Sequence, residues 1–192
     1  SSGVLKYVRV EYAGVILSQD NEVNGITFGG VGSGTTVEYV QVRMALDDCF
    51  EFFGGTVNAK HLVCQYNQDD GFDFDNGYSG KLQFLVLQQD PVHAGEDNGF
   101  ESDNDATGSG NLPLTNPQVY NATLCGKNAD PDAAQFGMLI RRNSRGKFGN
   151  IIATGFEASL DIRDATGTAL KTQAPGEPQF DIRGSLFFNA KS

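Results

Sequence analysis

The chain has 192 residues, a formal net charge of −10, 24 glycines and no tryptophan. This charge argues against nucleic acid as a partner, because nucleic-acid binding needs clustered Lys and Arg side chains that displace phosphate counterions. No apolar run approaches the length of a membrane span. The length suits one sizeable core, so we expect a single domain over residues 1–192.

Five segments alternate apolar and polar residues, which is the pattern of a half-buried β-strand. In the second of them, for example, Val40 and Val42 flank Gln41. No segment shows a clear helical period, and the nearest candidate for a single helical turn lies at residues 128–136. We therefore expect an all-β protein, with strands in chain order at residues 5–12, 37–44, 60–66, 81–88 and 119–125.

A second, shorter motif recurs along the chain. It consists of Asn or Asp, then Gly or Cys, then an apolar residue, as in NGITF, DCFEF, DGFDF and NGFES. Most repeats are spaced by 22 to 28 residues, and the one step of 38 contains a Gly-, Asn- and Pro-rich stretch that predicts a loop insertion near residues 103–117. The apolar residues that lead the motif are Ile26, Phe50, Phe72 and Phe100, followed more loosely by Met138 and Leu160.

A repeat this short cannot bury its own apolar face and must stack on its neighbours. An antiparallel sandwich of hairpins would not require the same corner after each equivalent strand, whereas a solenoid of similar coils does. The pattern therefore favours a parallel β-helix with roughly 22–28 residues per coil. In that register Phe72 and Phe74 face inward and stack on Phe50 and Phe52, while Asp73 faces outward.

Several segments of the sequence resemble a known protein family. GVLKYVRVEYAG, GTTVEYVQVRMALDDCFEFFGGTVNAKHLV, DDGFDFDNGYSGKLQF and GMLIRRNSRGKFGNIIATGF are similar to secreted β-helix proteins of Bacteroidetes and Myxobacteria. Those proteins are surface-associated or lipoprotein chains. The resemblance covers most of the chain and implies a right-handed, pectin-lyase-like solenoid in an extracellular or cell-surface location. It brings no catalytic motif with it. The chain itself is expected to be a segment of a longer solenoid or a stacking subunit.

Two polar columns follow from the repeat. The first contains the outward residues of the short motif, Thr27, Glu51, Asp73 and Glu101. The second lies at the corner before it and contains Asn24, Asp48, Asp70 and Asn98, whose side chains suit hydrogen bonds to local backbone. With coils about 4.8 Å apart, these corner side chains are also expected to bond one another as an internal ladder.

The same acidic residues raise the question of a metal. Carboxylates about 5 Å apart repel by roughly 1 kcal/mol in water, which solvated groups tolerate, so no cofactor is required. A bound Ca²⁺ is the alternative, because dense carboxylate oxygens are the ligands it prefers. The candidate ligands are Asp47, Asp48, Asp69, Asp70, Asp73 and Asp97.

The cysteines and the basic residues favour no catalytic site. Cys64 alternates with Val63 and is expected to face the core as a small apolar residue. A disulfide between Cys64 and Cys49, which lies at the preceding corner, is the less favoured alternative. The one basic cluster follows the long loop, several coils from the acidic residues, and is expected on a solvated edge. Its members are Arg141, Arg142, Arg145 and Lys147.

The favoured function is a non-enzymatic structural or adhesive module with neither catalytic nor cofactor-binding residues. Its expected partners are other copies of itself or further coils of a longer chain, through an edge formed by Leu186, Phe187 and Phe188. Polysaccharide is a further candidate partner. The alternative is a polysaccharide lyase, which needs Ca²⁺ and a converging Arg or Lys, or a glycoside hydrolase built on outward carboxylates such as Glu51, Asp73 and Glu101.

Overall fold

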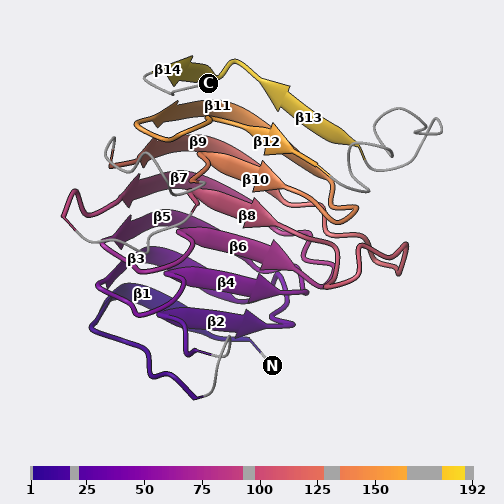
Figure 1. Cartoon of the computed structure of the whole chain (residues 1–192). Helices are drawn as coiled ribbons and strands as arrows, with labels where there is room; N and C mark the ends of the chain where they lie inside the picture. The colour runs from indigo at the N-terminus through magenta and orange to yellow at the C-terminus, as the bar shows by residue number, and fades with distance from the viewer. Residues whose placement is uncertain (1, 18–21, 93–97, 128–134, 164–178, 189–192) are drawn as a thin grey trace.

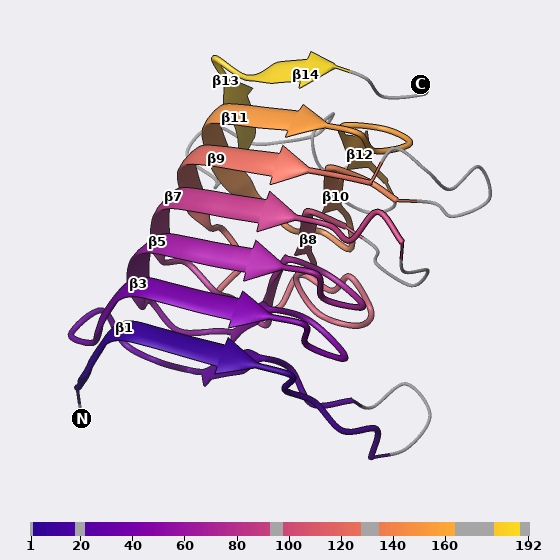
Figure 2. The same cartoon turned by 90° about the vertical axis from the view of Figure 1, so that its left-hand side faces the viewer.

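The computed structural model describes residues 2–17, 22–92, 98–127, 135–163 and 179–188. These residues form a right-handed parallel β-helix, as the repeat and the resemblance predicted. Figures 1 and 2 show the coils stacked along one axis, with one sheet on each side of a shared interior. Within the described residues there is no helix that is long and apolar enough to cross a membrane.

One sheet is built from the long strands of successive coils, and every pair in it is parallel. Its order is β1, β3, β5, β7, β9, β11 and β13, with β14 also paired to β11. The strands are β1 (Val4–Glu11), β3 (Thr36–Arg43), β5 (Asn58–Gln65), β7 (Lys81–Gln88), β9 (Gln118–Cys125), β11 (Gly146–Thr154), β13 (Phe180–Arg183) and β14 (Leu186–Phe188).

The other sheet is built from the short motif of the repeat, and its strands are also parallel. Its order is β12, β10, β8, β6, β4, β2. The strands are β2 (Ile26–Gly29), β4 (Phe50–Phe53), β6 (Phe72–Asp75), β8 (Phe100–Ser102), β10 (Met138–Ile140) and β12 (Asp161–Ile162). The expected loop insertion near 103–117 contains no strand, and the candidate helical turn at 128–136 lies mostly outside the described residues.

The core is filled by the inward residues of both sheets. Phe50, Phe52, Phe72, Phe74 and Phe100 are fully buried, which confirms the predicted aromatic column. The rings of Phe50 and Phe72 stack 5.3 Å apart, so each coil covers the apolar surface of its neighbour. The valines, leucines and other inward residues of the long strands close the core from the opposite side.

The long strands contain a bend that the sequence did not reveal. Tyr7, Tyr39, His61 and Phe84 each have φ between 56° and 60°, and the pairing register skips them. This left-handed conformation is uncommon for bulky residues. Their rings stack outside the core, with centroids 5.0, 4.4 and 4.9 Å apart in that order. Each of these four long strands is therefore two short segments that meet at an aromatic corner, and Asn121 and Asn150 adopt the same conformation at the equivalent positions of β9 and β11.

Candidate functional site

The acidic residues of the repeat line a groove on the outer face of the short-strand sheet. The groove has a volume of about 540 Å³ and extends over β2, β4, β6 and β8 and the corners that precede them. None of the described residues that line it is Lys, Arg or His. We call it the acidic groove; its acidic members are Glu22, Asp47, Asp48, Glu51, Asp69, Asp70, Asp73 and Glu101.

The corner column connects each coil to the next. Asp48 Oδ1 accepts a hydrogen bond from the backbone N–H of Asp70 at 2.9 Å, and Asp70 Oδ1 accepts one from the N–H of Asn98 at 2.7 Å. Asn98 Oδ1 accepts in turn from the N–H of Phe136 at 3.0 Å. These side chains therefore accept hydrogen bonds from the backbone of the following coil. The sequence instead predicts bonds to the local turn or between neighbouring side chains. Asn24 differs, because its Oδ1 is buried without a hydrogen-bond partner.

Three carboxylates of the groove are buried, contrary to the expectation of solvated groups, whereas the others remain partly exposed. Asp48, Glu51 and Asp70 are 6%, 9% and 5% exposed. Burial, followed by repulsion from neighbouring carboxylates, raises the pKa of Asp48, Asp70 and Asp73 well above the ordinary value. Burial also raises the pKa of Glu51 to about 7. Keeping all of these groups ionised at neutral pH is therefore unfavourable without a compensating positive charge.

The groove brings together two sets of oxygen ligands that fit a hard cation. Carboxylate oxygens of Asp47, Asp48 and Asp69 lie within 4.8 Å of one another, and so do those of Asp48, Glu51 and Asp73. Asp73 Oδ1, like the Oδ1 of Asn24, is buried without a hydrogen-bond partner. A purely oxygen donor set of this kind suits Ca²⁺. Of the other candidate ligands, Asp70 is directed to the backbone of Asn98, and Asp97 lies outside the described residues.

The basic cluster does not lie where the sequence predicted. Arg141 forms ion pairs with Glu101 and, at 3.0 Å, with Asp103. Arg142 Nη1 lies 2.6 Å from Asp103. The prediction of a solvated edge several coils from the acidic residues is wrong for both arginines, because β10 pairs directly with β8 across the long insertion.

The remaining two members of that cluster separate. Arg145 is buried, and its Nη1 donates to the backbone carbonyls of Asn143 and Ser144 at 2.6 and 2.9 Å. Lys147 is exposed and lies in the other sheet, on β11. The four residues therefore do not form one basic site.

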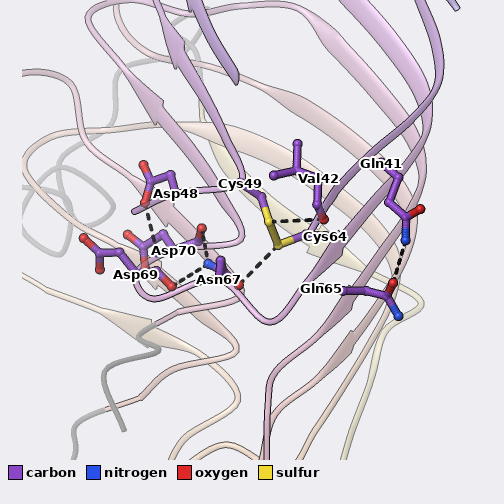
Figure 3. Close-up of a disulfide and its surroundings, with 9 residues drawn as sticks. All are labelled: Gln41, Val42, Asp48, Cys49, Cys64, Gln65, Asn67, Asp69 and Asp70. Atoms are coloured by element: carbon purple, nitrogen blue, oxygen red, sulfur yellow. Dashed lines mark hydrogen bonds between the residues drawn. A yellow bond between two sulfur atoms is a disulfide. The ribbon is translucent and has the colours of Figure 1, made fainter. Parts of the chain in front are cut away.

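Cys49 and Cys64 form a disulfide, with their Cα atoms 5.7 Å apart. The prediction of an unpaired Cys64 is wrong, because the corner before β4 turns Cys49 inward toward the same core face as Cys64. Figure 3 shows the bond beside Asn67, whose side-chain nitrogen donates to the carbonyls of Asp69 and Asp70 at 2.7 and 2.6 Å. The disulfide thus supports the corner that carries the acidic residues.

The predicted assembly edge is an exposed strand. Leu186, Phe187 and Phe188 form β14, and their exposed fractions are 56%, 36% and 43%. Figure 2 shows β14 at the end of the stack of coils, beyond β11. At the other end of the stack, β1 has β3 as its only partner strand among the described residues.

Comparison with known proteins gives one result that bears on the fold. A family model described as "Pectate-lyase like beta helix domain" matches residues 1–181. No match was found among curated proteins or among solved structures. The family match agrees with the two stacked parallel sheets and with the solenoid that the sequence predicted.

Proposed function

The chain belongs to the family of pectate-lyase-like β-helix domains, and we propose that it is a non-enzymatic structural and adhesive module of a bacterial surface whose acidic groove binds Ca²⁺. The observation that carries this proposal is the burial of Asp48, Glu51 and Asp70 beside other carboxylates, with no basic residue among the described lining. A divalent cation would offset that repulsion and could be coordinated by the unpartnered side-chain oxygens of Asn24 and Asp73.

The arrangement of the basic residues supports a non-catalytic role. A lyase would need a Lys or Arg side chain free to act on a substrate held over the acidic residues. Arg141 follows β10 on the same sheet, but it is held by Glu101 and Asp103. Its guanidinium therefore serves to join neighbouring coils.

The disulfide supports a location outside the reducing cytosol. Cys49 and Cys64 are both fully buried, and their bond closes a loop with a sequence separation of 15. Stable structural disulfides of this kind are characteristic of secreted and surface proteins. We therefore propose that the module functions in the extracellular space or on the cell surface.

The exposed ends of the stack support association with further coils. One face of the Tyr7 ring on β1 stacks on Tyr39, and the residue as a whole is 80% exposed. Unpaired strand edges recruit other strands. We propose that β1 and β14 pair with coils of another copy or of a longer chain, so that the module becomes part of an extended rod.

A glycoside hydrolase is the second candidate, and the pKa of Glu51, raised to about 7, is the observation that favours it. A carboxyl group with that pKa is suited to donate a proton to a leaving group. Its neighbour Asp73 would have to act as an ionised nucleophile or base. Burial raises the pKa of Asp73 as well, which opposes that role and makes this candidate the weaker one.

One pair of measurements separates the two candidates. Calcium is titrated into the chelator-treated chain by calorimetry, and the same protein is incubated with pectin, alginate and β-glucan while new reducing ends and unsaturated products are measured. We expect calcium binding and no cleavage. Asp73→Asn should weaken calcium binding at least about tenfold, while the control Asp75→Asn, on the same strand but outside the groove lining, should not. Cleavage that is lost in Glu51→Gln would establish the hydrolase instead.

A further inference from the structure

The first halves of the long strands present a concentration of lysines on the side of the solenoid away from the acidic groove. Lys6, Glu38 and Lys60 follow one another in register, and the column continues through Gln83 to Tyr120. Lys81 and Lys147 flank Gln118 in a second column. Four of the seven lysines of the chain therefore lie on one surface, which we call the lysine face: Lys6, Lys60, Lys81 and Lys147.

The lysine face keeps a net positive charge although the whole chain is acidic. Glu38 is paired with both Lys6 and Lys60, at 2.9 and 3.2 Å, and these ammonium groups hold its pKa below the ordinary value. Lys81 and Lys147 form no ion pair with a described residue. Asp181 lies beside Lys147 in register but is paired with Arg183 at 2.8 Å. The lysines thus outnumber the carboxylate that neutralises them.

A groove of about 440 Å³ crosses this face and has the composition of a saccharide-binding surface. It is lined by Thr35, Asn58 and Gln83, which offer hydroxyl and amide groups, and by Lys60, Lys81 and Tyr120. Glu38 also lines it, but its carboxylate is paired with Lys6 and Lys60. The Tyr120 ring lies against the backbone of Gly149, where a Cβ atom would approach it to 2.7 Å. Tyr120 is nevertheless 40% exposed, so part of its ring is open to the groove.

We propose that the lysine face binds an anionic polysaccharide, with Lys60 and Lys81 contacting its carboxylate or sulfate groups and Tyr120 packing against a sugar ring. The inference rests on the adhesive role proposed above, since it names the polymer that the module holds. Charge complementarity selects an anion, and the amides and the aromatic ring select a hydroxylated, ring-containing one. The lysines recur along the stack of coils, so a polymer with repeating charge contacts several of them.

The test measures binding of the whole chain to alginate, which carries carboxylates, and to dextran sulfate, which carries sulfates, with neutral dextran as the control. EDTA is present, so that Ca²⁺ cannot bridge a polymer to the acidic groove. We expect binding to at least one anionic polymer, weakened by added salt, and none to neutral dextran. Lys60→Gln combined with Lys81→Gln should weaken binding at least about tenfold, and Tyr120→Ala about tenfold.

Arg9→Gln is the matched control, because it removes one exposed positive charge from a long strand on the other side of the aromatic corner. It should leave polymer binding within about twofold, and melting temperatures should show that all variants fold. Binding that survives the lysine substitutions would overturn the inference while leaving the adhesive role intact. Absence of binding by the unaltered chain would also overturn the inference, whereas the proposed function is tested by the calcium titration and the cleavage assay, because EDTA removes any contribution of the acidic groove here. Lysine-dependent dimerisation without polymer binding would assign the face to a second copy and contradict the proposal.

Discussion

The side chain of Asp48 holds the backbone of the next coil, because its Oδ1 accepts a hydrogen bond at 2.9 Å from the N–H of Asp70, 22 residues further along the chain. Asp70 repeats this contact with Asn98. The corner column therefore stabilises the stacking of coils directly, at the same place where its carboxylates form one wall of the acidic groove. Stability and the proposed cation binding are therefore coupled at these residues.

This ladder predicts a contrast between two substitutions at one position. Asp70→Ala leaves the N–H of Asn98 buried without its acceptor and should cost about 1–3 kcal/mol in the free energy of unfolding. Asp70→Asn keeps an acceptor oxygen, as Asn98 itself does, and removes a repelling charge, so it should be much less destabilising. Urea denaturation measures both, and equal losses for the two variants would show that the bond to the next coil is unimportant.

The aromatic column predicts a large effect of cavity formation. Phe72 is fully buried and its ring lies 5.3 Å from that of Phe50. Phe72→Ala should reduce the free energy of unfolding by about 3–5 kcal/mol. Phe53→Ala is the matched control, because Phe53 is on the neighbouring strand β4 but is 37% exposed. A similar loss in both variants would contradict the assignment of Phe72 to the core.

Much of this fold could be predicted because its signals are local. Alternation in strands such as Val40–Gln41–Val42 and the recurring Asp–Gly–Phe corner each report on neighbouring residues, and stacking then follows from the repeat. The aromatic corner at Tyr39 and His61 gave no such signal, because a positive φ is uncommon in residues other than glycine. The position of Arg141 was predicted wrongly for another reason. The long insertion separates it in sequence from Glu101, although β8 and β10 are adjacent in the sheet. Predicting the disulfide required knowing which way the Cys49 side chain points. The alternation of apolar and polar residues does not define this direction at a corner between strands.

The disulfide predicts a redox-dependent stability. It closes a loop with a sequence separation of 15, for which the loss of unfolded-state entropy corresponds to about 3 kcal/mol. Cys49→Ser combined with Cys64→Ser, or reduction by dithiothreitol, should lower the free energy of unfolding by that order. Cys125→Ser, at the free cysteine, should have little effect. Unchanged stability after verified reduction would contradict the prediction.

The exposed strand β14 predicts end-to-end association. Phe187→Lys adds a charge to the strand that would pair with a further coil, and charges on edge strands oppose such pairing. Sedimentation velocity over a range of protein concentrations should show larger species for the unaltered chain and fewer for the variant. Main-chain hydrogen bonds and apolar contacts are little affected by modest salt, so the association should persist when salt is raised. A chain that stays monomeric at high concentration would contradict the proposed stacking.

The acidic groove predicts an unusual dependence of stability on pH when calcium is absent. The pKa of Glu51 rises from 4.5 to about 7, and those of Asp48, Asp70 and Asp73 rise in the same direction. Between the unfolded and folded pKa values the folded chain binds more protons than the unfolded chain, so its stability falls as pH rises through that window. Glu51→Gln should flatten this dependence, because it removes one of the titrating groups.

The most direct test of the proposed calcium binding is the melting temperature at about pH 5 and about pH 7.5, each measured in EDTA and in excess calcium. We expect the melting temperature in EDTA to be lower at the higher pH. Calcium should raise it strongly at the higher pH and only weakly at the lower pH, where the groove is protonated. A melting temperature that calcium leaves unchanged at both pH values would contradict the assignment of the acidic groove as a calcium site.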